Sequence, residues 1–274
     1  MVYFYHSIYM IISLIEGLYK QPVRKTNMKS INKSVRILDA LVQTNGARVA
    51  ELSKLLDIPN STVHSHLSAL KECGLVRSDG DTYMIGLKCL YYGGSLLHDN
   101  DIYALVEPKV EVLARETGGR AQFMVEQDGQ VVYLFTEAID DAAVQTDVRP
   151  GEFVDLHSTA AGKAILAHYS EERVDEIIDN HGLESYTPHT ITDRDVLHRE
   201  LATVREQGYA INDEERIMKQ RAIGVSILDT LGQPIGGLSV SGPAHRISND
   251  EHHEMILDLL LGITEETELN IQYQ

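Results

Sequence analysis

The chain has 274 residues, of which 43% are hydrophobic and 24% are charged. This composition is typical of a globular protein with a core in each of about two domains, and it excludes a fully disordered or collagen-like chain. The 24 basic and 41 acidic residues give a net charge of −17, so the chain as a whole is poorly suited to binding a polyanion.

The charge is distributed unevenly along the sequence. Residues 28–86 contain seven basic and six acidic residues, whereas residues 87–274 contain 14 basic and 34 acidic residues. Only the first of these segments is therefore suited to approach DNA. The acidic surplus fits a salt-loving organism and an ordinary acidic cytosolic protein equally well.

The first 27 residues begin with an apolar run, residues 2–18, that contains His6 and Glu16. The run is shorter than the roughly 20 apolar residues of a membrane span, and it lacks the flanks of a secretory signal. Met28 begins a segment that reads like an ordinary protein start. We expect residues 1–27 to be an untranslated or unstructured extension, with an interfacial membrane helix as the alternative; no membrane partner is predicted.

Three helices are predicted after Met28. Apolar residues recur at helical spacing over residues 37–42 and 49–56, and the second helix ends at Ile58-Pro59 because proline cannot continue the hydrogen-bond ladder. Asn60 is the predicted cap of a third helix over residues 61–73.

A hairpin and a further helix are predicted next. Strands at residues 75–77 and 83–85 are joined by a turn at Asp79-Gly80. Three helices and a hairpin make a winged helix-turn-helix, whose third helix enters the major groove of DNA. Residues 87–100 are predicted to form a linker helix, broken or bent near Gly93-Gly94, that packs against another subunit.

The predicted third helix has one apolar and one polar side. Val63, Leu67 and Leu70 form the apolar stripe, and small polar residues suited to base edges and phosphates lie opposite. The candidate DNA-binding residues are Asn60, Ser61, Thr62, His64, Ser65, Ser68, Lys71, Arg77 and Lys88. Because winged helices also bind proteins, a protein-interaction adaptor is the alternative.

Residues 101–274 predict an α+β domain. A helix ends at Gly118-Gly119, two strands follow around a turn at Asp128-Gly129, and a capping box over residues 248–251 begins the last helix. Further strands are expected at residues 143–148, 153–156, 209–212, 222–228 and 234–241, and helices at 162–168, 171–180 and 193–207. An antiparallel sheet covered by helices leaves a small-molecule pocket between sheet and helix.

The chain is predicted not to be an enzyme. His157-Ser158-Thr159 lacks the Gly-x-Ser-x-Gly elbow of hydrolases, and residues 161–164 lack the full phosphate-loop pattern. The acidic run at residues 213–215 could bind a metal but is more typical of a solvent-facing strand end. Cys73 and Cys89 are expected to fill core positions in a reducing cytoplasm, and no metal site or cofactor is predicted.

Several short motifs, by their order and spacing, resemble the IclR family of transcriptional regulators over residues 30–267. The N-terminal motifs are SVRILDAL at 34–41, PNSTVH at 59–64 and YMIG at 83–86. The C-terminal motifs are VYL at 132–134, HSTAAGKAILA at 157–167, YTP at 186–188, GYA at 208–210, DEE at 213–215 and LSVSGP at 238–243.

The resemblance implies a cytoplasmic homodimer or homotetramer that binds double-stranded operator DNA, with a GAF-like C-terminal domain for a small-molecule effector. An organic acid, a sugar acid or an aromatic compound is the expected effector. The implied effector-binding residues are Val154, Ala160, Ala161, Asn212, Ala222, Ser239 and Ser241.

Two residues depart from the usual pattern of the family. Ser65 stands where a basic residue is common, which weakens base reading by a bidentate arginine. Asn212 stands where an acid is common, and its amide offers both a donor and an acceptor. The effector class is therefore expected to differ, and the small Ala222 indicates a roomier pocket.

Overall fold

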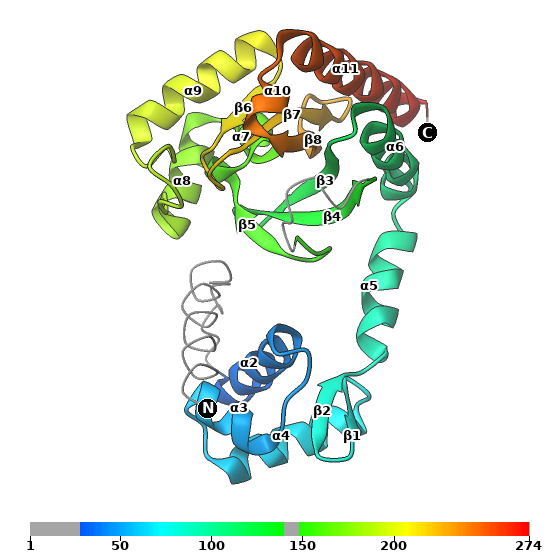
Figure 1. Ribbon diagram of the computed structural model, residues 1–274, viewed down its shortest axis with the longest axis vertical. Coiled ribbons are helices and arrows are strands. Elements are labelled where there is room, and N and C mark those ends of the chain that lie inside the picture. The colour runs from blue at the N-terminus through cyan, green and yellow to red at the C-terminus, as the bar shows by residue number, and fades with distance from the viewer. Residues whose placement is uncertain (1–27, 140–147, 274) are drawn as a thin grey trace. The chain divides into compact units, whose positions relative to one another are not determined.

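The computed structural model describes residues 28–139 and 148–273 (Figure 1). The chain divides into two compact units, with the boundary between Asp99 and Asn100. The predicted extension at residues 1–27 and nearly all of the strand expected at 143–148 lie outside the described residues. Among the described helices, none is both long and apolar enough to span a bilayer.

The N-terminal unit is a winged helix-turn-helix, as predicted. Its elements are α2 (Lys29–Gln43), α3 (Val49–Leu56), α4 (Asn60–Glu72), β1 (Val76–Asp79), β2 (Thr82–Ile85) and α5 (Lys88–His98). The predicted stripe of Val63, Leu67 and Leu70 is buried, and it packs with Ile37 of α2 and Leu52 of α3. These apolar contacts hold α4 by one side and leave its polar side at the surface.

Three local predictions for this unit are wrong. Helix α4 begins at Asn60 itself, because Pro59 takes the cap position and its carbonyl accepts the first helical hydrogen bonds, so Asn60 is not a cap. Cys73 is exposed because it ends α4 at the surface, and Cys89 is only half-buried. Helix α5 is one continuous helix through Gly93-Gly94, so it is not broken there.

The hairpin turn also differs from the prediction by one residue. Asp79 pairs with Thr82, so the two turn residues are Gly80 and Asp81 rather than Asp79 and Gly80. Gly80 has a φ of 55°, a left-handed conformation that suits glycine in a tight hairpin turn.

The C-terminal unit has the predicted α+β architecture. A six-stranded antiparallel sheet has the order β5-β4-β3-β8-β7-β6. Its strands are β3 (Arg120–Gln127), β4 (Gln130–Ala138), β5 (Phe153–Asp155), β6 (Ala210–Asp213), β7 (Gln220–Leu228) and β8 (Pro234–Pro243). Its helices are α6 (Asp101–Thr117), the short turn η1 (Leu156–Ser158), α7 (Ala160–Leu166), α8 (Glu171–His181), α9 (Arg194–Gln207), α10 (Ala244–Ile247) and α11 (Asp250–Gln272).

The two faces of this sheet are covered by different helices (Figure 1). Helices α6 and α11 pack on one face, where the ring of Phe123 lies 6.2 Å from Phe135 and 6.1 Å from Tyr103. Helix α7 packs on the other face, with Met124 and Tyr133 in its core. Alternate residues of each strand therefore serve two different cores.

The start of α11 differs from the prediction. Asn249 is the cap, and its side chain accepts a hydrogen bond from the backbone of His252 at 3.2 Å. Ser248, the expected cap, instead ends α10, a short helix that the sequence analysis did not predict. The predicted capping box is therefore wrong by one residue, although both side chains have the chemistry of a cap.

Helix α7 lies unusually close to the sheet because two strands carry glycine beneath it. A Cβ atom on Gly224 would lie 2.5 Å from the backbone of Ala160 and Ala161, and one on Gly237 would lie 3.0 Å from the Cβ of Ala161. These distances leave no space for a side chain. The glycines thus set how near the start of α7 comes to β7 and β8.

We expect Gly224→Ala to lower the free energy of unfolding by about 1–3 kcal/mol, because the added methyl group must displace the start of α7. Gly262→Ala in α11 is the matched control, since nothing lies within 4 Å of the added atom. Alanine has the higher helix propensity, so this control should stabilise by about 0.5–1 kcal/mol. Urea unfolding measures both values, and stabilisation by both variants would contradict the close packing of α7.

Candidate functional site

The polar side of α4 is the first candidate surface. Val63 and Leu67 hold the helix to its core, and the predicted residues occupy the other positions. Asn60, Ser61, His64, Ser65 and Lys71 are exposed, and Thr62 and Ser68 are half-buried. No carboxylate interrupts this side between Asn60 and Lys71. Over residues 60–71, this side of α4 therefore presents no carboxylate that would repel phosphate.

Three basic residues gather where α4 meets the hairpin. Lys71 donates a hydrogen bond from Nζ to Ser78 Oγ of β1 at 2.7 Å, and Arg77 is exposed on the same strand. The stem of Lys88 packs beside Gly74, just after α4, and its ammonium lies 5.8 Å from the ring centre of Tyr92. All three predicted phosphate contacts therefore lie near one end of α4.

A fourth basic residue was missed by the sequence analysis. Arg48 is exposed immediately before α3, and its backbone N–H donates to Glu51 Oε2 at 2.7 Å. In a helix-turn-helix the first helix crosses the DNA backbone, so this position suits a phosphate contact. A basic residue at the predicted start of that helix was the available signal.

The second candidate site is a cavity of about 50 Å³ between the sheet and the start of α7. It is lined by Gln122, Met124, Tyr133, Val148, Thr159, Ala160, Asn212, Arg216, Ile217, Gln220, Ala222, Ser239 and Ser241. These residues combine an apolar wall with several hydroxyl and amide groups, which is typical of a small-molecule site.

Most of the predicted effector residues line this cavity. The five that do so are Ala160, Asn212, Ala222, Ser239 and Ser241. The other two do not. Val154 belongs to the edge strand β5, pairs with Val131 and is buried in the α7 core, whereas Ala161 packs against Gly224 and Gly237. Both residues support the cavity wall from behind.

Asn212 is largely engaged with the protein backbone. Its Nδ2 donates to the carbonyl of Ser158 at 2.5 Å, and its Oδ1 accepts from the N–H of Glu215 at 3.1 Å. The side chain thus ties η1 to the turn after β6. Only part of the hydrogen-bonding capacity expected of this amide is open to a ligand.

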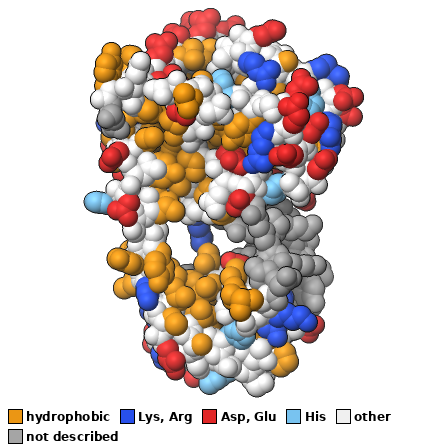
Figure 2. Space-filling view, turned by 180° about the vertical axis from the view of Figure 1, so that it is seen from behind, with side chains coloured by type: hydrophobic (Ala, Val, Ile, Leu, Met, Phe, Trp, Pro, Cys, Tyr) orange, Lys and Arg blue, Asp and Glu red, His pale blue; other side chains and the backbone are white. Residues whose placement is uncertain are grey.

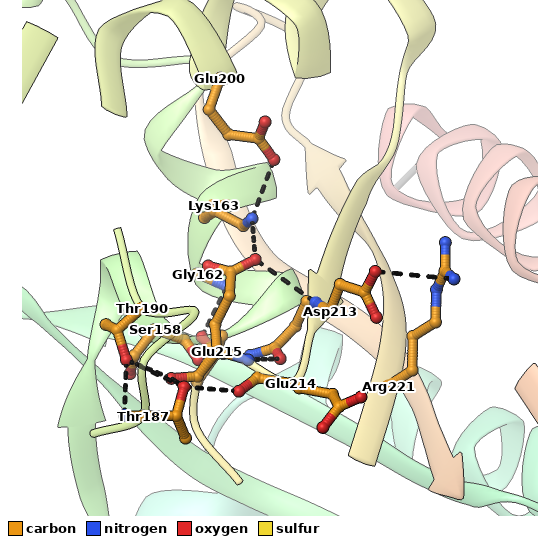
Figure 3. Close-up of polar contacts among 12 residues, drawn as sticks. Ser158, Gly162, Lys163, Thr187, Thr190, Glu200, Asp213, Glu214, Glu215 and Arg221 are labelled. Atoms are coloured by element: carbon orange, nitrogen blue, oxygen red, sulfur yellow. Dashed lines mark hydrogen bonds and ion pairs between the residues drawn. The ribbon is translucent and has the colours of Figure 1, made fainter. Parts of the chain in front are cut away.

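The turn after β6 is anchored by a buried ammonium group (Figure 3). Lys163 of α7 is 1% exposed, and its Nζ lies 2.6 Å from Glu215 Oε1 and 2.8 Å from Glu200 Oε1. Burial raises the pKa of the Glu215 carboxyl, and the charge of Lys163 opposes this rise. Glu215 is therefore an internal ion-pair partner, and the expectation that residues 213–215 are solvent-facing is wrong for it.

Two threonines fasten the same turn (Figure 3). The hydroxyls of Thr187 and Thr190 donate to the backbone carbonyl of Glu215 at 3.2 and 2.5 Å. Asp213, by contrast, is exposed and lies 3.8 Å from Arg221. The acidic run thus combines one buried and one surface ion pair.

Arg216 is a cavity residue that the sequence analysis missed. Its Nη1 donates to Ser158 Oγ at 3.1 Å, and its guanidinium lies 4.7 Å from the ring centre of Tyr186. The hydroxyl of Tyr186 in turn donates to Asp155 Oδ2 at 2.5 Å. Arg216 directly follows the acidic run at residues 213–215, and this local pattern gives no signal that its side chain lines the cavity.

Comparison with known protein families matches both units. Residues 30–80 match the IclR helix-turn-helix domain, and residues 94–265 match the bacterial transcriptional regulator IclR C-terminal domain. The chain is 36% identical over 228 residues to the probable HTH-type transcriptional regulator ArcR of Halobacterium salinarum, covering 81% of this chain and 86% of that protein. It is 29% identical over 227 residues to the transcriptional repressor IclR of Escherichia coli, covering 81% and 83%.

Solved structures have the same fold. The crystal structure of Thermotoga maritima IclR aligns with a TM-score of 0.75 and 30% identity, covering 89% of this chain and 99% of that one. An IclR homolog from Microbacterium hydrocarbonoxydans, crystallised with 4-hydroxybenzoate, aligns with a TM-score of 0.73 and 21% identity, covering 90% and 100%.

Proposed function

Because the chain belongs to the IclR family of DNA-binding transcriptional regulators, we propose that a small molecule bound in its C-terminal cavity controls its affinity for operator DNA. Its relatives are regulators rather than enzymes. One observation carries the effector proposal: Ser241 lines the cavity, and its buried Oγ has no hydrogen-bond partner among the described residues. A buried hydroxyl without a hydrogen-bond partner costs free energy unless a ligand or a water molecule supplies that hydrogen bond.

The effector class rests on the cavity and on one relative. The cavity volume of about 50 Å³ has room for a few water molecules or a compact organic molecule. The homolog from Microbacterium hydrocarbonoxydans, whose structure contains 4-hydroxybenzoate, is an acid-binding member of the same fold. An organic acid, sugar acid or aromatic remains our proposal for this chain, with Ala160, Asn212, Ala222, Ser239 and Ser241 as contacts and Val154 and Ala161 behind them.

For the DNA site we propose that the polar side of α4 meets base edges in the major groove. Asn60, Ser61, Thr62, His64, Ser65 and Ser68 form this side. Lys71, Arg77, Lys88 and Arg48 would contact phosphates on either side of it. Operator DNA as the partner implies that the protein acts in the cytoplasm.

For the oligomer we propose that α5 packs against a second copy of the chain. None of its residues is buried, and its apolar residues Leu90, Tyr91 and Leu96 are 72%, 71% and 57% exposed. Figure 2 shows hydrophobic side chains gathered at the surface of the N-terminal unit. An apolar helix in water favours association, which supports a homodimer or a homotetramer.

We expect Leu90→Glu to weaken self-association at least about tenfold, because it places a charge in an apolar contact. Leu231→Glu is the matched control, since Leu231 is 82% exposed in the turn before β8. Light scattering across a concentration series gives the mass of each variant. Equal association of both variants would show that α5 is not the contact.

Binding to DNA from the protein's own upstream region tests the function itself. The purified protein, started at Met28, is titrated with that duplex and with a scrambled duplex across a salt series. Saturable and selective binding is expected. The logarithm of the binding constant should fall linearly with the logarithm of the salt concentration, with a slope of about −0.9 for each phosphate contacted. Equal and weak binding to both duplexes would favour the protein-interaction adaptor instead.

A further inference from the structure

In the part of the chain that the structure describes, three buried polar atoms without hydrogen-bond partners lie on the cavity face of the sheet: Arg120 Nε, Thr136 Oγ1 and Ser241 Oγ. They are neighbours through strand pairing. Arg120 pairs with Ser241 across β3 and β8, and Thr136 pairs with Gln122, which follows Arg120 by two residues on the same face. Gln122 and Ser241 line the cavity, so Arg120 and Thr136 continue its polar wall beyond the lining.

An anion satisfies this wall better than water does. Water molecules can pair with the hydroxyls of Thr136 and Ser241, but they carry no charge to offset a half-buried guanidinium. In the described part of the chain, the ion pairs found do not include one between Arg120 and a carboxylate. Buried charges in proteins are usually paired, and among residues 28–139 and 148–273 no carboxylate takes that place for Arg120.

Arg216 stands at the other end of the same cavity. One row of paired residues crosses four strands in the order Arg120, Ser241, Ala222 and Asn212. At about 4.8 Å per strand, the row spans roughly 14 Å of backbone. Arg216 follows Asn212 in the turn after β6, so the two long side chains approach the cavity from opposite ends.

The charges around the cavity point to an anion at both ends. Among the described residues that line it, Arg216 is the one that carries a charge. Two acids near it are engaged, Asp155 with Tyr186 and Glu215 with Lys163. The phenol of Tyr133 lies within the field of both arginines. Burial raises the pKa of Tyr133, and the negative charge of Glu152 adds to this rise. The positive charges of Arg216 and Arg120 oppose it.

We propose that the effector is a dianion, such as a short dicarboxylate, with one anionic group held by Arg216 and the other by Arg120. This inference rests on the effector function proposed above and specifies its ligand. Each guanidinium donates two N–H groups to one carboxylate, and Ser241 and Thr136 add hydroxyl donors beside Arg120. The short side chain of Ala222 leaves the space between the two ends for the ligand's carbon chain.

Calorimetric titration of the full chain tests this proposal with a matched series of probes. The probes are the α,ω-dicarboxylates from malonate to adipate and the monocarboxylates of equal carbon number. We expect one dicarboxylate to bind at least about tenfold tighter than its monocarboxylate. Arg120→Gln and Arg216→Gln should each weaken that dicarboxylate by about ten- to a hundredfold and remove the preference.

The matched control is Arg199→Gln, because Arg199 is exposed on α9 and does not line the cavity. Arg199→Gln removes the same positive charge, and it should leave the affinities for the dicarboxylate and the monocarboxylate unchanged. Arg120→Lys and Arg216→Lys accompany the glutamine variants. They keep the charge but lose the bidentate geometry, so an intermediate affinity separates ligand contact from misfolding.

Two results would overturn the dianion. One is equal wild-type affinity for both members of every pair, including no binding of either; the other is a preference that survives in both glutamine variants. The effector function is judged separately, by whether any small molecule, acidic or neutral, releases the protein from its operator. If a neutral compound releases the protein from its operator, the effector function is supported and the proposal of a dianionic effector is rejected.

Discussion

Replacing Ser65 by glutamate is expected to lower affinity for the operator at least about a hundredfold, or roughly 3 kcal/mol. Ser65 is exposed on the polar side of α4, so its replacement disturbs no core contact. A carboxylate there would face the phosphates and base-edge acceptors of the groove, and like charges brought together in an interface repel strongly. Fluorescence anisotropy at fixed salt measures the loss.

The control for this experiment is Thr203→Glu, which adds the same charge to an exposed position of α9 in the C-terminal unit. It should leave operator affinity within about twofold of wild type, since surface substitutions are usually neutral to within about 0.5 kcal/mol. Comparable losses in both variants would mean that net charge, rather than the α4 surface, governs binding.

Replacing Lys163 by methionine should lower the free energy of unfolding by about 3–5 kcal/mol, because it leaves the carboxylate of Glu215 buried without a counter-charge. This is a large share of the about 5–15 kcal/mol that stabilises a typical domain. Urea unfolding followed by circular dichroism gives the value. Since Glu200 is 33% exposed, solvent compensates that second partner more readily.

The double variant Lys163→Met with Glu215→Gln separates charge from packing. Removing the stranded charge should restore a substantial part of the lost stability, because a neutral amide is far less costly to bury than a carboxylate. If the double variant is no more stable than Lys163→Met alone, the ion pair is not what holds the turn after β6.

Local patterns in the sequence predicted most of the helices and strands, and the errors in these predictions have local causes. The stripe of Val63, Leu67 and Leu70 identified α4, because periodicity reports directly on burial. The cap of α11 was placed on Ser248 rather than Asn249, since adjacent residues with equal capping chemistry are not separable by pattern. Gly93-Gly94 suggested a break or a bend in α5, but the helix is continuous, because glycine lowers helix propensity without ending every helix.

The cavity shows where such reasoning ends. Ala160 and Ser239 were named through a family resemblance, and both line the cavity. Arg120 and Ser241 are far apart in the chain and become neighbours only through the pairing of β3 with β8. Lys163 and Glu215 likewise meet only after α7 docks on the sheet. Contacts of this kind depend on topology and strand register, which periodicity does not encode.

The position of Ala222 has an evolutionary consequence. It occupies the middle of the residue row that crosses the cavity, between Ser241 and Asn212, and it carries the smallest side chain that still has a Cβ. A single codon change there alters the space for a ligand while the helices, the sheet and the DNA-facing surface keep their residues. Under the effector function proposed above, descendants of this gene can therefore acquire responses to new metabolites while they continue to regulate the same promoters.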